Sequence, residues 1–229
     1  MRSEREVVAE AYASGRVRFM GIELLVTPGA LVPRHETELL ARTAVERLVD
    51  LAVPTPRVID ICCGAGNLAC AIAHHVPGSR IWAADLTDAC VDLTRRNVEL
   101  CKVSGRVSVH QGDLFGAFEG LGLEGTIDAV VCNPPYISDK RLENENAHLL
   151  DLEPREAFSA GPYGLSIHMR VVRDVVPFLR PGGLLLLEVG LRQDRQVKIL
   201  FDRTKAYQDV TVVRNDACEG RVVLGYKTS

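Results

Sequence analysis

Short apolar runs alternate with helix-periodic segments along most of this chain. The apolar runs predict five strands, at residues 58–61, 80–84, 107–110, 127–132 and 184–189. Apolar side chains at helical spacing predict helices between them, over residues 67–75, 87–101 and 165–179. Strands that are almost wholly apolar and separated by helices are typical of a parallel sheet covered on both faces. The pattern therefore predicts a doubly wound, Rossmann-like α/β fold.

The two ends of the chain follow a different pattern. Residues 210–213 and 222–226 predict two strands with no helix between them, which indicates an antiparallel hairpin at the sheet edge. The opening residues predict a helix over 4–13, a hairpin over 17–19 and 22–26, and a helix over 36–51. We therefore expect residues 1–52 to form a short helix, a hairpin and a lid helix that pack on a main domain of residues 53–229.

Composition places the chain among ordinary globular proteins. Of its 229 residues, 47% are hydrophobic and 25% are charged, values that exclude a disordered chain, collagen and a coiled coil. The net charge is −3 and the isoelectric point is about 6.1. Proteins that hold nucleic acid through its phosphates carry a basic surface, so the charge disfavours nucleic acid as a partner.

The sequence shows no feature of export or membrane anchoring. The first residues are charged and lack the apolar core of a signal peptide, and every apolar run is too short to span a bilayer. Seven cysteines occur without a C-x-x-C pair, and Cys62, Cys63 and Cys132 fall inside apolar runs. We therefore expect a cytoplasmic protein with buried, reduced thiols, no metal site and no membrane partner.

Glycine and acidic residues follow the first three predicted strands. Ligands of doubly wound sheets bind beyond the carboxyl ends of the strands, so these residues are candidates for a binding site. Gly64 and Gly66 can bring backbone N–H groups close to an anionic group, and Asp85 can accept hydrogen bonds from ribose hydroxyls. Asp113 and Leu114 suit the edge and the face of an adenine ring.

Each of these features also has a purely structural explanation. The glycines can form a tight turn, Asp85 can cap a helix, and Asp113 can lie in a surface loop. The pattern Gly64-x-Gly66-x-x-Ala69, with Asp85 about twenty residues later, also fits the dinucleotide fingerprint. The joint occurrence at successive strand ends favours a ligand with a nucleoside part, which leaves nicotinamide dinucleotides open.

A more specific motif, Asn133-Pro134-Pro135-Tyr136, follows the fourth predicted strand. The two prolines fix φ and carry no N–H, which leaves carbonyl oxygens as acceptors beside the asparagine amide. Such acceptors can hold the hydrogens of an NH2 group while its lone pair faces another direction. A stiff loop with a core tyrosine is the structural alternative. The position after a strand of this series favours an amino-group site over a nicotinamide site.

Five segments in order resemble the HemK-type glutamine-amide methyltransferases, which modify peptide-chain release factors with S-adenosylmethionine. They are Val32-Pro-Arg-His-Glu-Thr-Glu38, Asp60-Ile-Cys-Cys-Gly-Ala-Gly66, Asn133-Pro-Pro-Tyr136, Leu152-Glu-Pro-Arg-Glu-Ala157 and Pro181-Gly-Gly-Leu184. Asn-Pro-Pro-Tyr is shared with nucleic-acid amino-methyltransferases, whereas the first and fourth segments are more specific to the glutamine type.

The resemblance implies an S-adenosylmethionine-dependent N-methyltransferase with a class I methyltransferase sheet. The residues that it implies in cofactor binding are Asp60, Cys62, Cys63, Gly64, Ala65, Gly66, Asp85, Leu86, Asp113, Leu114 and Asn133. Those implied in catalysis, where they hold the amino group to be methylated, are Asn133, Pro134 and Tyr136. Those implied in the roof of the site and in substrate contacts are Pro33, Arg34, His35, Glu36, Pro135 and Glu153.

The chain departs from the family pattern in several places. Cys62 stands where the family usually has glycine, His35 stands where it has proline, and Pro162-Tyr163-Gly164-Leu165 replaces Asp-Gly-Leu. Family members also carry an N-terminal helical domain that grips the release factor, whereas only residues 1–16 precede the predicted hairpin here. We therefore expect a small acceptor with an amide, amine or guanidino nitrogen, and treat release factor or another protein as the alternative partner.

The loop after the tetrapeptide is acidic, with Glu143, Glu145, Asp151, Glu153 and Glu156. It forms either a solvated lid or a surface for a cationic acceptor. The sequence identifies no general base, because the nearest histidines, His35, His148 and His168, are more typical of structural roles. A nicotinamide oxidoreductase, a nucleic-acid amino-methyltransferase and a noncatalytic cofactor-binding protein remain as alternatives.

Overall fold

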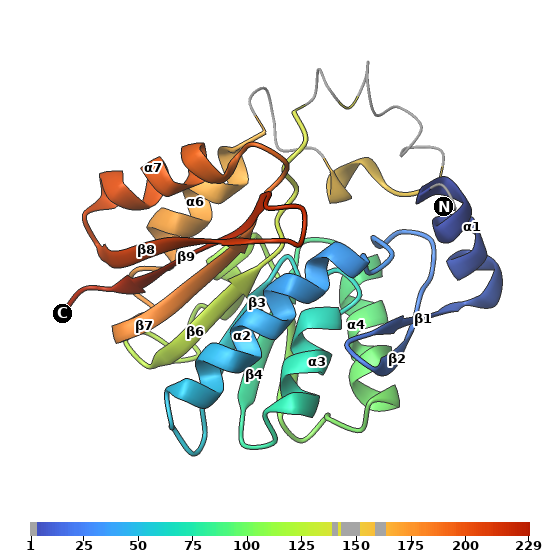
Figure 1. Ribbon diagram of the computed structural model, residues 1–229. Helices are drawn as coiled ribbons and strands as arrows, with labels where there is room; N and C mark the ends of the chain where they lie inside the picture. The colour runs from blue at the N-terminus through green and yellow to red at the C-terminus, as the bar shows by residue number, and fades with distance from the viewer. Residues whose placement is uncertain (1–3, 139–141, 143–151, 159–163) are drawn as a thin grey trace.

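The computed structural model describes residues 4–138, 142, 152–158 and 164–229. Its main sheet has seven strands in the order β5-β4-β3-β6-β7-β9-β8 (Figure 1). The strands are β3 (Arg57–Ile61), β4 (Arg80–Asp85), β5 (Val107–Gln111), β6 (Ile127–Cys132), β7 (Leu179–Glu188), β8 (Tyr207–Arg214) and β9 (Gly220–Lys227). β3 to β7 pair in parallel, and β9 pairs antiparallel with β7 and β8. The predicted doubly wound sheet with an antiparallel hairpin at its edge is confirmed.

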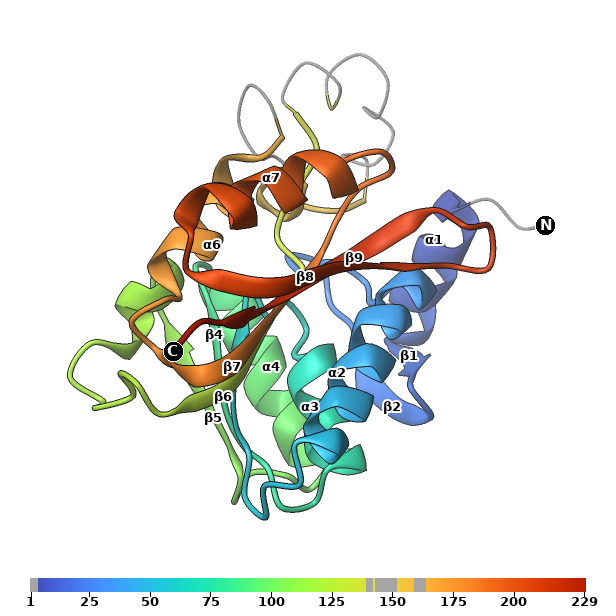
Figure 2. The same ribbon diagram turned by 60° about the vertical axis from the view of Figure 1, so that its left-hand side comes forward.

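Helices cover both faces of this sheet (Figures 1 and 2). On one face pack α2 (Glu38–Asp50), α3 (Asn67–His75) and α4 (Asp88–Leu100). On the other pack the 3₁₀ helix η2 (Leu114–Phe118), α6 (Ser166–Asp174) and α7 (Asp194–Thr204). Each face has its own apolar core, because each helix turns one apolar side towards the strands. Within the described ranges, no helix is long and apolar enough to cross a membrane.

The beginning of the chain forms a helix and a separate two-stranded antiparallel hairpin. These elements are α1 (Glu4–Ser14), β1 (Arg16–Phe19) and β2 (Ile22–Leu25). Asn97 holds the hairpin against helix α4, to which it belongs. Its Oδ1 accepts from Leu25 N at 2.7 Å and its Nδ2 donates to Leu25 O at 3.0 Å. The predicted helix over 36–51 begins as a 3₁₀ turn, η1 (His35–Thr37), which leads into α2.

Three features differ from the prediction made from periodicity. α6 ends at Asp174 rather than at residue 179, because Pro177 lacks the N–H that continues a helix. β7 begins at Leu179 and takes in the Pro-Gly-Gly segment that was expected to precede it. Periodicity does not predict α7, since only Val197 and Phe201 are buried in it, and such a narrow apolar stripe is easily missed.

The strand order places the candidate residues together. β3 lies between β4 and β6, so the chain order reverses there. The carboxyl ends of these three strands therefore meet at the edge where doubly wound sheets bind ligands. Cys62 follows β3, Leu86 follows β4 and Asn133 follows β6 at that edge.

Candidate functional site

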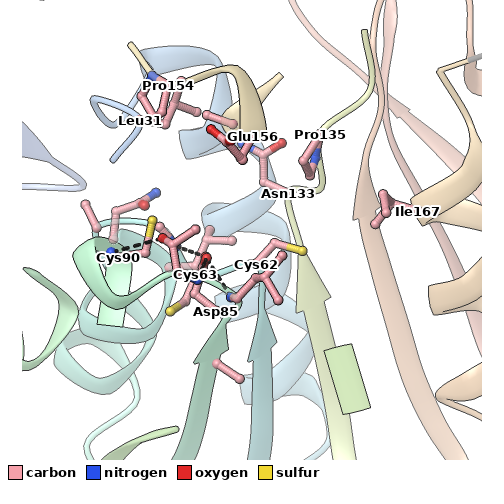
Figure 3. A pocket seen from close by; sticks show the side chains of 18 of the residues that line it. Leu31, Cys62, Cys63, Asp85, Cys90, Asn133, Pro135, Pro154, Glu156 and Ile167 are labelled. Atoms are coloured by element: carbon pink, nitrogen blue, oxygen red, sulfur yellow. Dashed lines mark hydrogen bonds between the residues drawn. The ribbon is translucent and has the colours of Figure 1, made fainter. Parts of the chain in front are cut away.

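Two cavities lie at this edge of the sheet and share one wall. The strand-end cavity, of about 430 Å³, opens above β3 and β4 and is shown in Figure 3. The loop cavity, of about 560 Å³, lies on the other side of the Asn133-Pro134-Pro135-Tyr136 segment. The residues that line both cavities are Leu31, Pro33, Arg34, Asn133 and Ala157. Asn133 therefore lies in the wall that the two cavities share.

The turn after β3 forms the floor of the strand-end cavity, with Cys62, Cys63, Gly64 and Ala65 in its wall. Gly66 has a φ of 74°, and a Cβ there would lie 2.7 Å from Thr94 Cγ2. Only glycine meets both conditions, so the turn can pack closely on α4. Cys62 also has a positive φ, 58°, which explains why glycine suits this position in the family pattern.

Asp85 fixes this turn to the end of β4. Its Oδ2 accepts a hydrogen bond from Gly64 N at 2.9 Å, and its Oδ1 accepts one from Leu86 N at 2.8 Å. A carboxylate has about four lone-pair sites, so Asp85 can still accept from a ligand in the cavity that it lines. Figure 3 shows Asp85 beside Cys62 and Cys63, with Leu31, Pro154 and Glu156 across the cavity.

Asp60 and Gly66 do not line either cavity, although the resemblance implies both in cofactor binding. Asp60 is fully buried, and its Oδ2 accepts from Ala69 N at 3.0 Å, which ties the start of α3 to β3. Its Oδ1 has no hydrogen-bond partner among the described residues. Burial raises the pKa of the Asp60 carboxyl to about 8, and nearby Asp85 adds to that rise. Both residues support the turn from behind.

The far end of the strand-end cavity is apolar with one ion pair. Leu86, Leu114 and Ile167 present apolar surface there. Asp113 lines the same end and pairs with Arg170 Nη2 at 2.8 Å. Sequence reasoning missed Ile167 and Arg170, which reach the site from α6 and follow no strand-end pattern.

The tetrapeptide divides its side chains between the cavities. Pro135 lines the strand-end cavity, and Pro134 and Tyr136 line the loop cavity. Gly190, just after β7, leaves room for the tyrosine ring, since a Cβ there would lie 3.0 Å from Tyr136 Cδ2. Gln193 Nε2 also donates to Tyr136 O at 2.9 Å. The predicted stiff loop is thus held from two directions, with Asn133 exposed to both cavities.

The predicted roof is held together by a buried ion pair. Pro33 and Arg34 line both cavities, and Arg34 pairs with Glu153. Glu153 lines neither cavity, but its Oε1 accepts from Val32 N at 2.9 Å. It therefore joins two segments that are far apart in the sequence. His35 and Glu36 line the loop cavity.

A second charged pair, missed by the sequence analysis, lies in the wall of the loop cavity. Glu188 ends β7 with 2% of its surface exposed, and Arg221 Nη2 lies 3.6 Å from its Oε1. Burial raises the pKa of Glu188 to about 7, although Thr37, Arg221 and Tyr136 stabilise its charged form. Glu188 is the last residue of β7 as Asp85 is of β4, but it falls inside the strand predicted over 184–189. The available signal was a lone acid after the apolar run 184–187.

The histidines and the acidic loop give little chemistry within the described residues. His168 is fully buried, contacts Glu188 O through Nε2 at 2.9 Å, and lines neither cavity. Burial lowers its pKa to about 4, which fits a structural histidine. His148, Glu143, Glu145 and Asp151 lie outside the described residues. The cysteines are free thiols, and the described residues contain no cluster suited to a metal ion.

The residues of the strand-end cavity fit an adenosine-containing cation. Its volume lies in the range of about 300–1,000 Å³ found for small-molecule sites. Its wall contains the Asp85 carboxylate and the apolar side chains of Leu86 and Leu114. These groups are of the kinds that suit ribose hydroxyls and a purine ring, as expected from the sequence.

Comparison with known proteins gives consistent results. Residues 36–156 match the family model "Methyltransferase small domain". A release factor glutamine methyltransferase of Moorella thermoacetica is 35% identical over 94% of this chain and 74% of its own length. A 4-amino-L-phenylalanine/4-methylamino-L-phenylalanine methyltransferase of Streptomyces pristinaespiralis is also 35% identical, over 89% of this chain and 72% of its own.

Solved structures give the same fold. A protein-(glutamine-N5) methyltransferase from Alicyclobacillus acidocaldarius has a TM-score of 0.51 and 26% identity, covering 89% of this chain and 99% of that one. A methyltransferase from Pyrococcus furiosus has a TM-score of 0.64 at 16% identity, with both chains covered in full. The second likeness supports the fold alone, which is the Rossmann-like class I methyltransferase sheet.

Proposed function

Since this chain belongs to the HemK-type glutamine methyltransferases, we propose that it methylates a glutamine side-chain amide of a peptide-chain release factor. It is an S-adenosylmethionine-dependent N-methyltransferase. The relatives support a release factor over the small acceptor expected from the sequence. That expectation rested on the residues before the hairpin and on surface charge, and neither bears on the shape of the acceptor cavity.

The observation that carries the proposal is the pair of cavities meeting at Asn133. The strand-end cavity fits the cofactor, and the loop cavity takes the acceptor from the other side. When bound, S-adenosylmethionine supplies an electrophilic methyl group for in-line displacement. Asn133 Oδ1 and Pro134 O accept the hydrogens of the acceptor NH2 and direct its lone pair towards the strand-end cavity. Orientation of this kind is worth about 7–11 kcal/mol in favourable cases.

Asn133 Oδ1 and Pro134 O also stabilise the charge that develops on the acceptor nitrogen. An amide nitrogen has a delocalised lone pair, and positive charge grows on it during transfer. Acceptor oxygens fixed beside it before the reaction stabilise that charge without reorganising. The Tyr136 ring forms a wall that holds the planar acceptor group against Pro134.

We further propose that residues 53–229 carry most of the cofactor site and that residues 1–52 complete both cavities. Val7 and Val8 of α1 line the loop cavity beside Pro33 and Arg34 of the roof. Their apolar surface is suited to the chain that flanks an acceptor glutamine.

The test is mass spectrometry of a bacterial release factor incubated with the enzyme and S-adenosylmethionine. We expect one added methyl group on one glutamine. Asn133→Ala should slow methylation by about 100-fold with cofactor affinity retained, as for loss of one oriented polar group. Asn67→Ala, which lines only the strand-end cavity, serves as the comparison variant.

A free aromatic amine is the second candidate acceptor. The Streptomyces pristinaespiralis relative acts on 4-amino-L-phenylalanine, and the loop cavity contains Tyr136, Phe158 and Leu191. Release factor and 4-amino-L-phenylalanine should therefore be compared in one assay. Faster methylation of the amino acid, with none on the release factor, would reverse the proposal.

A further inference from the structure

A line of polar side chains runs from Asn133 through Thr37 to Glu188, which lies in the wall of the loop cavity. Asn133 Nδ2 donates to Thr37 Oγ1 at 3.2 Å. Thr37 lies in η1 and has 1% of its surface exposed. Its hydroxyl faces the carboxylate of Glu188 and stabilises the charged form of that group. An amide, a hydroxyl and a carboxylate therefore lie in sequence behind the tetrapeptide.

Several elements favour the charged form of Glu188 against the effect of its burial. Arg221 of β9 lies 3.6 Å away, and the Tyr136 hydroxyl favours the charged form as Thr37 does. Glu36 of η1 opposes that charge, and His168 of α6 contacts only the main-chain oxygen of Glu188. Among the described residues, Glu188 Oε2 and Arg221 Nε have no hydrogen-bond partner. The pair is therefore buried from water while part of its hydrogen-bonding capacity is unused.

The hydrogen bonds along this line all run one way, from donors on the Asn133 side to the acceptor Glu188. An ionised carboxylate only accepts hydrogen bonds, so it draws the proton of the Thr37 hydroxyl towards itself. Thr37 Oγ1 is then left as an acceptor, and it selects the NH2 end of the Asn133 amide. The oxygen end of that amide must turn the other way, towards the shared wall of the two cavities.

We propose that Thr37 and Glu188 are positioning residues that set the orientation of the Asn133 amide so that its oxygen meets the acceptor nitrogen. The inference rests on the proposed function, because it takes Asn133 as the group that binds the acceptor. Thr37 lines the strand-end cavity and Glu188 lines the loop cavity, and the role assigned to each of them is to act through Asn133.

The arrangement also predicts a pH response. Burial raises the pKa of Glu188 to about 7, against the opposing effect of Thr37 and Arg221. When Glu188 takes up a proton it can donate to Thr37, which frees the Thr37 proton to bond the amide oxygen of Asn133. The amide then loses its preferred orientation. The rate of methyl transfer should therefore fall as pH drops through about 7.

Paired substitutions of Thr37 test this inference. Thr37→Val keeps the shape of the side chain but removes the hydroxyl, and kcat should fall by about 100-fold as for a misoriented reacting group. Thr37→Ser restores the hydroxyl and should restore most of kcat. Thr43→Val is the matched control, since Thr43 is also buried in this region but donates to Leu39 O at 2.7 Å. The unfolding midpoint should stay close to that of the parent protein in all three. Because Thr37 lines the strand-end cavity, the cofactor Kd is measured for each variant and kcat is compared at saturating cofactor.

The pH dependence of kcat distinguishes a positioning role from a purely structural one, because a loss of packing would not change it. The acidic limb of kcat should be present in the parent protein and in Thr37→Ser, and absent in Thr37→Val and Glu188→Gln. A glutamine both donates and accepts, so it imposes no direction on Thr37. Full kcat in Thr37→Val, or an unchanged acidic limb in Glu188→Gln, would overturn the inference.

Nuclear magnetic resonance separates this inference from the proposed acceptor. The side-chain amide signals of Asn133 should shift with the titration of the Glu188 carboxyl in the protein without acceptor. In Thr37→Val the Asn133 amide signals should no longer follow the titration of the Glu188 carboxyl. If the Asn133 signals follow Glu188 but release factor is not methylated, the positioning role stands and release factor is rejected as the acceptor. Independent titration in the parent protein would reject the inference whatever the acceptor.

Discussion

Asp85 joins the two segments that form the floor of the strand-end cavity. It accepts from Gly64 N at 2.9 Å and from Leu86 N at 2.8 Å, and both of its neighbours line the cavity. The carboxylate therefore ties the turn to the end of β4, and it has lone pairs left for a ligand in the cavity. Asp85→Asn removes the charge and also replaces one of the two accepting oxygens with an NH2 donor, so the free energy of unfolding is measured beside cofactor affinity.

We predict that Asp85→Asn weakens S-adenosylmethionine binding. The loss of a charged acceptor for ribose hydroxyls should cost about 1.5–3 kcal/mol, roughly 10- to 150-fold in Kd. Isothermal titration calorimetry measures this directly. Asp92→Asn is the matched control, because Asp92 is exposed on α4 and its one ion pair among the described residues joins its Oδ1 to Arg95 Nη1 at 3.4 Å. Equal affinity in Asp85→Asn and the control would contradict the assigned role.

At the scale of elements, the close contact between the turn after β3 and helix α4 depends on one glycine. A Cβ at Gly66 would lie 2.7 Å from Thr94 Cγ2, and φ is 74°. Thr94 is itself held, since its Oγ1 donates to Gly64 O at 2.9 Å. The turn and the helix therefore cannot move apart without losing this hydrogen bond.

Gly66→Ala should destabilise the protein by about 2–5 kcal/mol. This sums roughly 1–2 kcal/mol for a left-handed alanine and 1–3 kcal/mol for overpacking. Chemical denaturation gives the free energy of unfolding. Gly116→Ala is the comparison, because a Cβ at Gly116 meets nothing within 4 Å and its φ is not positive. A similar loss in both variants would mean that the contact with Thr94 is not responsible.

At the scale of the whole molecule, buried Asp60 makes stability depend on pH. Burial raises its pKa from 3.8 to about 8. Between these values the unfolded chain has released the proton while the folded chain keeps it. The free energy of unfolding therefore falls as pH rises through this window, by up to about 1.4 kcal/mol per pH unit from this group.

We predict that Asp60→Asn flattens this dependence. Asparagine stays neutral, and its oxygen can still accept from Ala69 N. Denaturation of the cofactor-free protein at several pH values between 5 and 8, about the window set by the raised pKa, measures the slope. Asp92→Asn should keep the slope of the parent protein. If Asp60→Asn keeps it too, another group is responsible.

The apolar pattern alone is sufficient to predict the sheet and to bring most of the candidate residues to one of its edges. Apolar runs such as residues 127–132 form strands because their side chains are buried on both faces, and this pattern is local. The strand-end rule then brought Cys62, Asp85 and Asn133 to one edge without any knowledge of packing. Short-range patterns are sufficient for such features.

Which distant side chains meet depends on how the elements pack. Thr37 lies 96 positions from Asn133, and Arg34 lies 119 positions from Glu153, yet each pair is in contact. Glu188 acquires its raised pKa from burial beside Arg221, which comes from another strand. Such contacts depend on the depth and register of several packed elements at once. No local pattern contains that information, so the orientation of Asn133 follows from the fold and not from the motif.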